Sequence, residues 1–158
     1  MANLNIRSNS RIVAMMILYN QDICKKFTGN GELLFDNFEA LLALIDTNTE
    51  SSKVDNLDES TKPAYNKEFV YSLVDGVNKN LDDIDYELSV AIEKYTLDRL
   101  SYVDRNLLRI GAYEILYTDT PKNIVINEII NISKEYSELE DYKTSKFNNA
   151  VLDKLNKK

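Results

Sequence analysis

The chain has 158 residues, of which 44% are hydrophobic, and its formal net charge is −7. That length suits one domain, or two small subdomains that share a core. Histidine is absent and Cys24 is the single cysteine, which excludes the usual zinc sites and the His-dependent catalytic arrangements. The sequence also lacks a phosphate-binding glycine motif and a long apolar run. We therefore expect no metal site and no membrane segment, and the composition argues against an enzyme without formally excluding one.

The first residues do not follow the pattern of a secretory signal peptide. A lone cysteine rules out an internal disulfide and fits a reducing compartment, so we expect a cytoplasmic protein. Basic residues predominate in residues 1–26 and 143–158, and acidic residues predominate between them. If the two basic ends meet in space, they form a basic patch on an acidic protein. Alternatively, the terminal lysines only keep the ends of the chain solvated.

Taken in chain order, the first predicted helix spans residues 8–27, because apolar residues recur there at spacings of three and four. Its expected inward face consists of Ile12, Met16, Tyr19, Ile23 and Phe27. Gly29-Asn-Gly31 breaks the pattern, and a second helix is predicted over 32–45. Residues 46–63 are polar and end in Pro63, which predicts a flexible linker.

Helical spacing resumes over residues 65–80 and again over 83–95. Ser101 and Asp104 resemble a capping box at the start of a helix that reaches Tyr117. Thr120-Pro121 predicts an N-cap and a first helical residue for a helix that ends near residue 137. A last helix is predicted over 144–156. The sequence thus predicts an all-α protein of about seven helices in one domain, residues 1–158. An N-terminal helical subdomain covers about 1–80 and a C-terminal helical subdomain about 81–158.

The helix at 104–116 is apolar around most of its circumference, which is typical of a helix in the middle of a bundle. Gly111 in its interior costs about 1 kcal/mol relative to alanine, so we expect another helix to cross closely there. Glu114 falls within the apolar arc, and a buried carboxylate needs a partner. The remaining polar side chains form one stripe, expected to be wet: Arg105, Asn106, Arg109 and Tyr113.

Three segments resemble the NusB family of bacterial transcription antitermination factors, in order and in spacing. They are Asp104-Arg-Asn-Leu-Leu-Arg-Ile-Gly-Ala-Tyr-Glu-Ile, Pro121-Lys-Asn-Ile-Val-Ile-Asn-Glu-Ile-Ile-Asn-Ile-Ser-Lys-Glu-Tyr and Ser145-Lys-Phe-Asn-Asn-Ala-Val-Leu-Asp153. Arg11, Ala14 and Leu18-Tyr19 also fit the family's opening helix. The resemblance implies two perpendicular helical subdomains. It further implies a non-enzymatic function without cofactor: binding of single-stranded boxA-type ribosomal RNA leader with a small-subunit ribosomal protein, NusE, so that RNA polymerase resists termination.

The resemblance also implies functional residues. The family's arginine-rich arm falls on Arg7 and Arg11, although positions 8–10 are Ser, Asn and Ser where relatives often add arginines. Residues expected near the RNA at the start of the last helix are Lys143, Lys146 and Phe147. Tyr19 and Asp104 match positions implicated in partner or RNA contact. Arg105 and Arg109, on the polar stripe, are further candidates for partner contact.

Each assignment has a structural alternative. Tyr19 and Phe147 are also explained as core residues, and Asp104 as a helix cap. Two other functional classes stay open: a helical protein-interaction module without an RNA role, and a helical domain related to those attached to ribosomal RNA methyltransferases. Because such a domain precedes a large catalytic region and this chain ends at Lys158, the standalone factor is the favoured hypothesis. A homodimer is possible, because apolar stripes on paired helices can self-associate.

Overall fold

The computed structural model describes residues 2–24, 38–40, 42–43, 65–94, 96–137 and 143–158. Regular structure in these residues is helical throughout, without a strand, which confirms the all-α prediction. The helices are α1 (Ala2–Cys24), α3 (Lys67–Lys79), α4 (Leu81–Ala91), η2 (Leu97–Arg99, a 3₁₀ helix), α5 (Tyr102–Tyr117), α6 (Lys122–Tyr136) and α7 (Lys143–Asp153). No helix in the described ranges is long and apolar enough to cross a membrane.

The predicted elements match these helices with shifted ends. The first helix begins at Ala2 instead of residue 8. Of the helix predicted at 32–45, residues 38–40 and 42–43 are described, and they are helical. The rest of that helix, Phe27 and the predicted linker at 46–63 lie outside the described residues. The short helix η2 has no counterpart among the predicted elements.

The face of α1 that points into the core differs from the predicted one. Tyr19 and Ile23 are 37% and 45% exposed, whereas the neighbouring Ile17 and Leu18 are fully buried. Ile12 and Met16 are only partly buried at the edge of the core. The true buried face is therefore rotated by about one residue, because α1 packs against both α3 and α5 and not against a single neighbour.

Side-chain caps fix the beginnings of two helices. Asn66 accepts a hydrogen bond from the Phe69 amide at the start of α3, at 3.0 Å. The predicted cap of α5 is confirmed, since Ser101 Oγ accepts from the Asp104 amide at 3.1 Å. The predicted start of α6 is wrong by one residue: Pro121 itself is the N-cap and makes no side-chain cap bond. Proline cannot donate a backbone hydrogen bond, so it suits either position.

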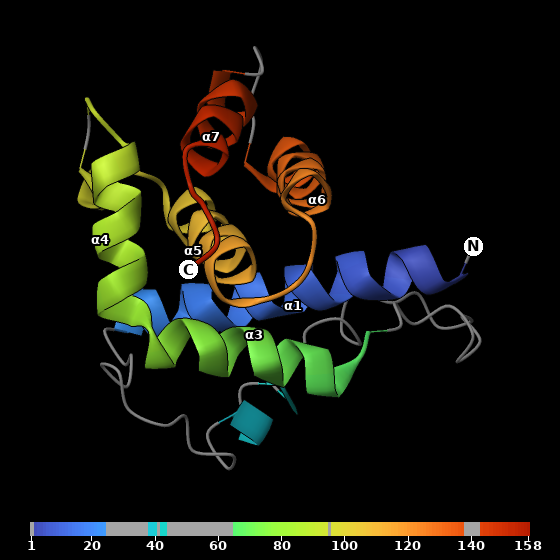
Figure 1. Cartoon of the computed structure of the whole chain (residues 1–158). Helices are drawn as coiled ribbons and strands as arrows, with labels where there is room; N and C mark the ends of the chain where they lie inside the picture. The colour runs from blue at the N-terminus through green and yellow to red at the C-terminus, as the bar shows by residue number, and fades with distance from the viewer. Residues whose placement is uncertain (1, 25–37, 41, 44–64, 95, 138–142) are drawn as a thin grey trace.

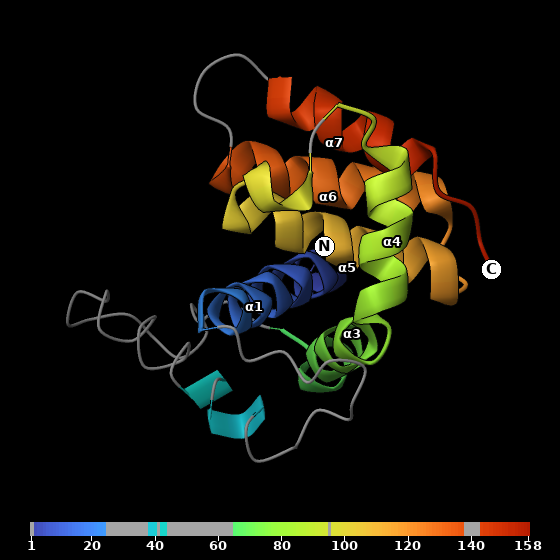
Figure 2. The same ribbon diagram turned by 90° about the vertical axis from the view of Figure 1, so that its left-hand side faces the viewer.

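The helices are arranged crosswise (Figure 1). α1 and α3 lie side by side across the view, while α5 and α6 are seen nearly end-on. In Figure 2, α5, α6 and α7 run across the view as successive layers, and α4 stands beside α5 and α7. This is the perpendicular arrangement that was predicted. Buried apolar side chains from all six α-helices named above form one continuous core.

Two glycines allow helices to approach closely. A Cβ atom on Gly111 would lie 3.0 Å from Leu152 Cδ2 of α7 and 3.3 Å from Ile129 Cγ1 of α6. The predicted close crossing at Gly111 is thus confirmed. Gly76 on α3 is tighter still, because a Cβ there would lie 2.2 Å from the ring of Tyr113 on α5. Both glycines therefore set the position of α5 in the bundle.

Candidate functional site

The beginnings of α5 and α7 enclose an open hollow of about 420 Å³, here called the α5–α7 hollow. It brings together three of the predicted site residues, Asp104, Lys143 and Phe147. Arg99 of η2 adds a second cation that the sequence analysis missed. Its remaining lining residues are Leu100, Ser101 and Thr144. An aromatic ring together with cations is the combination that proteins use to bind single-stranded nucleic acid.

Asp104 forms the floor of this hollow and is only 7% exposed. One carboxylate oxygen accepts from Ser101 Oγ at 2.8 Å, and the other accepts from Asn148 Nδ2 at 3.2 Å. Asn148 also donates to Ser133 Oγ, so this α7 side chain links α5 to α6. The helix-cap explanation of Asp104 is therefore supported, although the residue still borders the hollow.

The three residues predicted at the start of α7 differ in exposure. Lys143 and Lys146 are exposed, while Phe147 is partly buried and packs against the core as it lines the hollow. The two explanations offered for Phe147 are thus compatible, because the same side chain packs against the core and lines the hollow.

Arg11 lies inside the protein. It is 1% exposed, and its Nε and Nη2 each donate to Glu114 at 2.8 Å in a bidentate pair. Glu128 of α6 lies 3.9 Å from Nη1. We call these three residues the Arg11 cluster. The predicted partner of Glu114 is confirmed, but a buried guanidinium held this way cannot touch RNA without breaking the pair, so the proposed RNA contact of Arg11 is corrected.

Arg7, one turn earlier on α1, is exposed. Its guanidinium carbon lies 4.0 Å above the centre of the Phe69 ring, and Arg11 reaches the same ring at 5.4 Å. A planar cation that stacks on an aromatic face in this way is held by electrostatic attraction. Arg7 is therefore the member of the predicted arm that remains available to a ligand, and Phe69 is a neighbour that the sequence did not reveal.

The predicted polar stripe of α5 is not exposed to solvent at its three residues nearest the start of the helix. Arg105, Asn106 and Arg109 are 8%, 0% and 6% exposed. All three donate to a single oxygen of Asp22 on α1, at 2.8, 3.0 and 3.1 Å. Arg109 also donates two bonds to Asp85 of α4, both at 2.9 Å.

These five residues form a second buried network, the Asp22 cluster. Burial alone would lower the pKa of Arg105, but its hydrogen bond to Asp22 and the charge of Asp22 raise it above the usual value. The assignment of Arg105 and Arg109 to direct partner contact is corrected, because their donors are used inside the protein.

Above the Asp22 cluster lies an exposed aromatic patch. Tyr19 and Tyr102 meet edge to face with ring centres 5.8 Å apart, and they are 37% and 43% exposed. Ile23 follows Tyr19 by one turn and is 45% exposed. Arg105 lies 4.7 Å beneath the Tyr102 ring. We call Tyr19, Ile23 and Tyr102 the tyrosine patch; Tyr19 was predicted, and the other two are additions from the structure.

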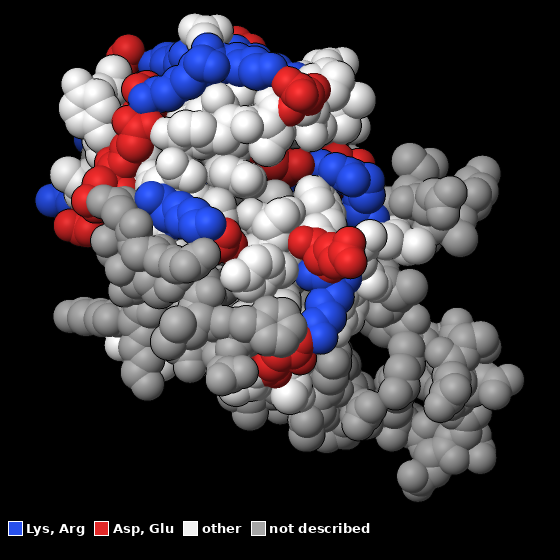
Figure 3. Space-filling model, turned by 60° about the horizontal axis from the view of Figure 1, so that its bottom comes forward, with Lys and Arg blue, Asp and Glu red and all other residues white. Residues whose placement is uncertain are grey.

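The described residues of the two basic ends lie apart, while Lys25 and Lys26 of the first end lie outside the described residues. Lys143 and Lys146 begin α7 beside the N-terminal end of α5, whereas Arg7 lies one turn from Arg11, which pairs near the other end. At the chain terminus, Lys154 pairs with Glu93, Lys157 with Asp119, and Lys158 with Asp83 and Glu87. On the face that Figure 3 shows, blue and red side chains are interleaved, apart from a blue band at its upper edge.

The last of these ion pairs, between Lys158 and Asp83, also includes Tyr117. Lys158 and Tyr117 both donate to Asp83, which lowers the pKa of the Asp83 carboxyl. Partial burial and the bond to Asp83 raise the pKa of Tyr117 to about 12. The terminal lysines therefore neutralise carboxylates of α4 and its neighbours. The sequence analysis had offered a basic patch or solvated chain ends, and neither explanation includes such ion pairs.

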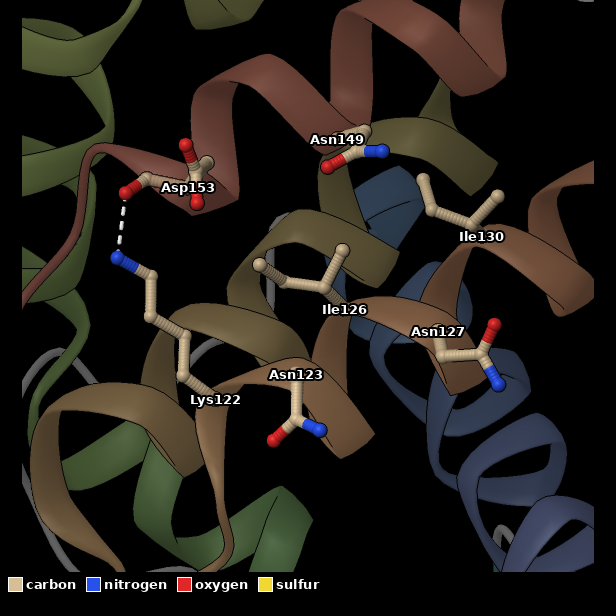
Figure 4. A pocket seen from close by; sticks show the side chains of 7 residues that line it. All are labelled: Lys122, Asn123, Ile126, Asn127, Ile130, Asn149 and Asp153. Carbon is tan, nitrogen blue, oxygen red and sulfur yellow. Dashed lines mark hydrogen bonds between the residues drawn. The ribbon is translucent and has the colours of Figure 1, made fainter.

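A second hollow of about 580 Å³ lies on the outer face of α6 and α7 (Figure 4). Asparagine and isoleucine side chains make up most of its wall, and at one end the Lys122 ammonium donates to the backbone carbonyl of Asp153. None of the predicted site residues lines it. The α5–α7 hollow, Arg7 and the tyrosine patch are therefore the candidate functional surfaces.

The sequence of this chain is similar to those of known proteins. Residues 8–157 match the model of the NusB family. The transcription antitermination protein NusB of Campylobacter jejuni (strain RM1221) is 42% identical over 99 residues, covering 63% of this chain and 73% of the relative. That of Shouchella clausii is 38% identical over 112 residues, covering 70% and 80%.

The fold is also similar to that of solved NusB structures. T. maritima NusB superposes with a TM-score of 0.66 at 31% identity, covering 93% of this chain and 87% of the other. A structure of the antitermination factors NusB and NusE in complex with double-stranded RNA has a chain with a TM-score of 0.65 at 25% identity, covering 92% of each. With a family model that spans nearly the whole sequence, the chain belongs to the NusB family.

Proposed function

We propose that this chain is an RNA-binding transcription antitermination factor, which binds boxA-type ribosomal RNA leader together with the ribosomal protein NusE and so makes RNA polymerase resist termination. The observation that carries the proposal is the family match over residues 8–157. Its relatives are named transcription antitermination proteins, and a similar fold has been solved with NusE and RNA. No catalytic step is part of the proposal.

In this proposal the RNA strand runs over the α5–α7 hollow. A base contacts the Phe147 ring where it lines the hollow, and Arg99, Lys143 and Lys146 neutralise backbone phosphates. Arg7 supplies a further cation from α1. Four neutralised phosphates predict a slope of about −3 in a plot of log affinity against log salt for a single strand.

The tyrosine patch is the proposed contact for the ribosomal protein. Tyrosine is enriched where interfaces are strongest, and a mixed patch of two tyrosines and one isoleucine is exposed at this site. The Asp22 cluster holds it from below without touching the partner. The overall charge of −7 favours association with a basic ribosomal protein and disfavours non-specific RNA.

Fluorescence anisotropy with a labelled boxA-containing RNA, with and without NusE, tests the proposal. We expect weak, salt-dependent binding by the chain alone and tighter, more specific binding with NusE. A variant that carries Lys143→Gln and Lys146→Gln should lose affinity, while Lys157→Gln, a lysine of the same charge paired with Asp119, serves as the matched control.

Two results would contradict the proposal. Salt-independent binding would remove its electrostatic basis. Binding to NusE without any binding to RNA would favour the protein-interaction module instead.

A further inference from the structure

The arginine arm of this chain is short, and the structure shows what stands in the places of the absent arginines. Ser10 Oγ accepts the backbone N–H of Asn66 at 2.8 Å and donates to the Ile6 carbonyl at 2.7 Å. Ser8 Oγ donates to Glu128 of α6. Both serines therefore tie the first turns of α1 to neighbouring helices, which long charged side chains in solvent would not do.

The bond from Ser10 has a consequence for Phe69. Asn66, held by Ser10, is the N-cap of α3 and accepts the Phe69 amide at 3.0 Å. The start of α3 is thus fixed against α1 through two successive hydrogen bonds. This chain of contacts places the Phe69 ring directly under the Arg7 guanidinium, at 4.0 Å.

Contacts with the core and with Arg11 also hold the Phe69 ring in place. It is partly buried and packs against the core. Arg11, which cannot move because of its bidentate bonds to Glu114, lies 5.4 Å from the same ring. The ring is therefore a fixed surface, and the exposed Arg7 guanidinium rests on it.

We propose that Phe69 is a positioning residue for RNA binding: it holds the guanidinium of Arg7 flat and in place, so that this exposed arginine of α1 meets the RNA already ordered. The inference rests on the proposed function. A flexible arginine loses side-chain freedom when it binds a phosphate or stacks on a base, and an arginine ordered beforehand loses less. One face of the guanidinium is occupied by Phe69, which leaves the other face and its edge donors for the strand.

The first test uses the protein alone. The ring current of Phe69 should shift the Arg7 side-chain NMR resonances upfield. Phe69→Leu should abolish that shift, while Phe69→Tyr, which keeps an aromatic face, should retain it. Arg7 resonances at random-coil positions in the unchanged protein would overturn the inference whatever the RNA result.

The second test is a double-mutant cycle on boxA-containing RNA in the presence of NusE, with Phe69→Leu, Arg7→Gln and the combination. Phe69→Leu should weaken binding by about two- to tenfold, the range for ordering one long side chain, and Phe69→Tyr should restore most of it. In the Arg7→Gln background, Phe69→Leu should have almost no further effect. Arg7→Gln should reduce the salt slope by about 0.7, whereas Phe69→Leu keeps the charge and leaves the slope nearly unchanged.

The outcomes separate the two proposals. If the unchanged protein binds RNA but Phe69→Leu weakens binding equally with and without Arg7, Phe69 has only a structural role and this inference fails alone. If the unchanged protein binds no RNA, both proposals fail. Thermal melting of each variant shows whether a loss of affinity comes from unfolding instead.

Discussion

Two places on α1, its middle and its C-terminal end, are attached to α5 by ion pairs of opposite arrangement. In the Arg11 cluster α1 supplies the cation and α5 the carboxylate, and in the Asp22 cluster α1 supplies the carboxylate and α5 the cations. Reversing α1 would place like charges together, so the two clusters specify its direction and register. Each cluster also lies next to an exposed candidate residue: Arg7 beside the first, and Tyr102 above the second.

The Arg11 cluster and the Asp22 cluster differ in how far their charged side chains are exposed to solvent. Both members of the Arg11–Glu114 pair are almost fully buried, whereas Asp22 and Asp85 are partly exposed. Removing one partner of a fully buried pair leaves an uncompensated charge, which is more costly than leaving a charge that water can reach. The comparison predicts that the Arg11 cluster is the more sensitive of the two.

Glu114→Ala should therefore have the largest effect, a loss of about 3–5 kcal/mol in the free energy of unfolding, because Arg11 stays buried without its bidentate partner. Urea denaturation followed by circular dichroism measures it. The double variant Arg11→Met/Glu114→Leu, which removes both charges, should recover most of the loss. A double variant as unstable as Glu114→Ala would show that the charge pair is not the cause.

Asp22→Asn should cost about 2 kcal/mol, since three donors lose a charged acceptor that is partly solvated. The same denaturation experiment measures it. NusE affinity should fall as well, because Tyr102 rests on Arg105, while RNA affinity in the absence of NusE should stay unchanged. Equal losses for both ligands would contradict the assignment of the tyrosine patch to NusE and of the α5–α7 hollow and Arg7 to RNA.

Gly76→Ala tests the contact that positions α3, and with it Phe69, against α5. Alanine gains about 1 kcal/mol in helix propensity, but its Cβ meets the Tyr113 ring, so we expect a net destabilisation of about 1–2 kcal/mol. Gly111→Ala is the matched control, because its Cβ meets the flexible end of Leu152 and should cost less. The reverse order, read from the melting temperatures, would contradict the packing described for α5.

Tyr102→Ala tests the tyrosine patch, because it should affect NusE binding without affecting the stability of the protein. The ring is 43% exposed, so the stability should change little, while NusE affinity should fall about tenfold, or about 1.4 kcal/mol. Isothermal titration calorimetry measures the affinity. Tyr86→Ala on α4, an exposed tyrosine outside the patch at 65%, is the control and should leave NusE binding intact.

The smallest effect is expected at the exposed pair of Asp83 and Lys158, which contrasts with both buried clusters. The folded-state pKa of Asp83 is lowered by Lys158 and Tyr117, so the bonds stabilise the protein above the ordinary aspartate pKa and are lost as the pH falls through the lowered value. The unchanged protein should lose stability slightly more steeply than Asp83→Asn between about pH 5 and pH 3. Identical acid profiles would show that the pair contributes nothing.

Much of the fold could be predicted because it depends on spacing. Four features follow from local patterns and were confirmed: the helix Tyr102–Tyr117, its cap Ser101, the close approach at Gly111 and the need of Glu114 for a partner. The face of α1 could not be predicted, since a helix that contacts two neighbours has a wide apolar surface, and its centre depends on where those neighbours lie.

The candidate site was less predictable for a related reason. Position in the chain says which residues are charged, but not whether a carboxylate from another helix reaches them. Arg11, Arg105 and Arg109 looked exposed because their partners are far away in sequence, at Glu114, Asp22 and Asp85. Arg99 and Phe69 were missed because neither belongs to a motif, and only packing brings them beside Phe147 and Arg7.

The sequence by itself determined the helical class, the order of the helices and membership of the NusB family, since these follow from periodicity, caps and motifs within single segments. Tertiary structure decided which charges remain for a ligand. A charge is free or neutralised according to what lies within about 4 Å of it, and on α1 that distance separates Arg7, stacked at the surface, from Arg11, one turn away and paired inside.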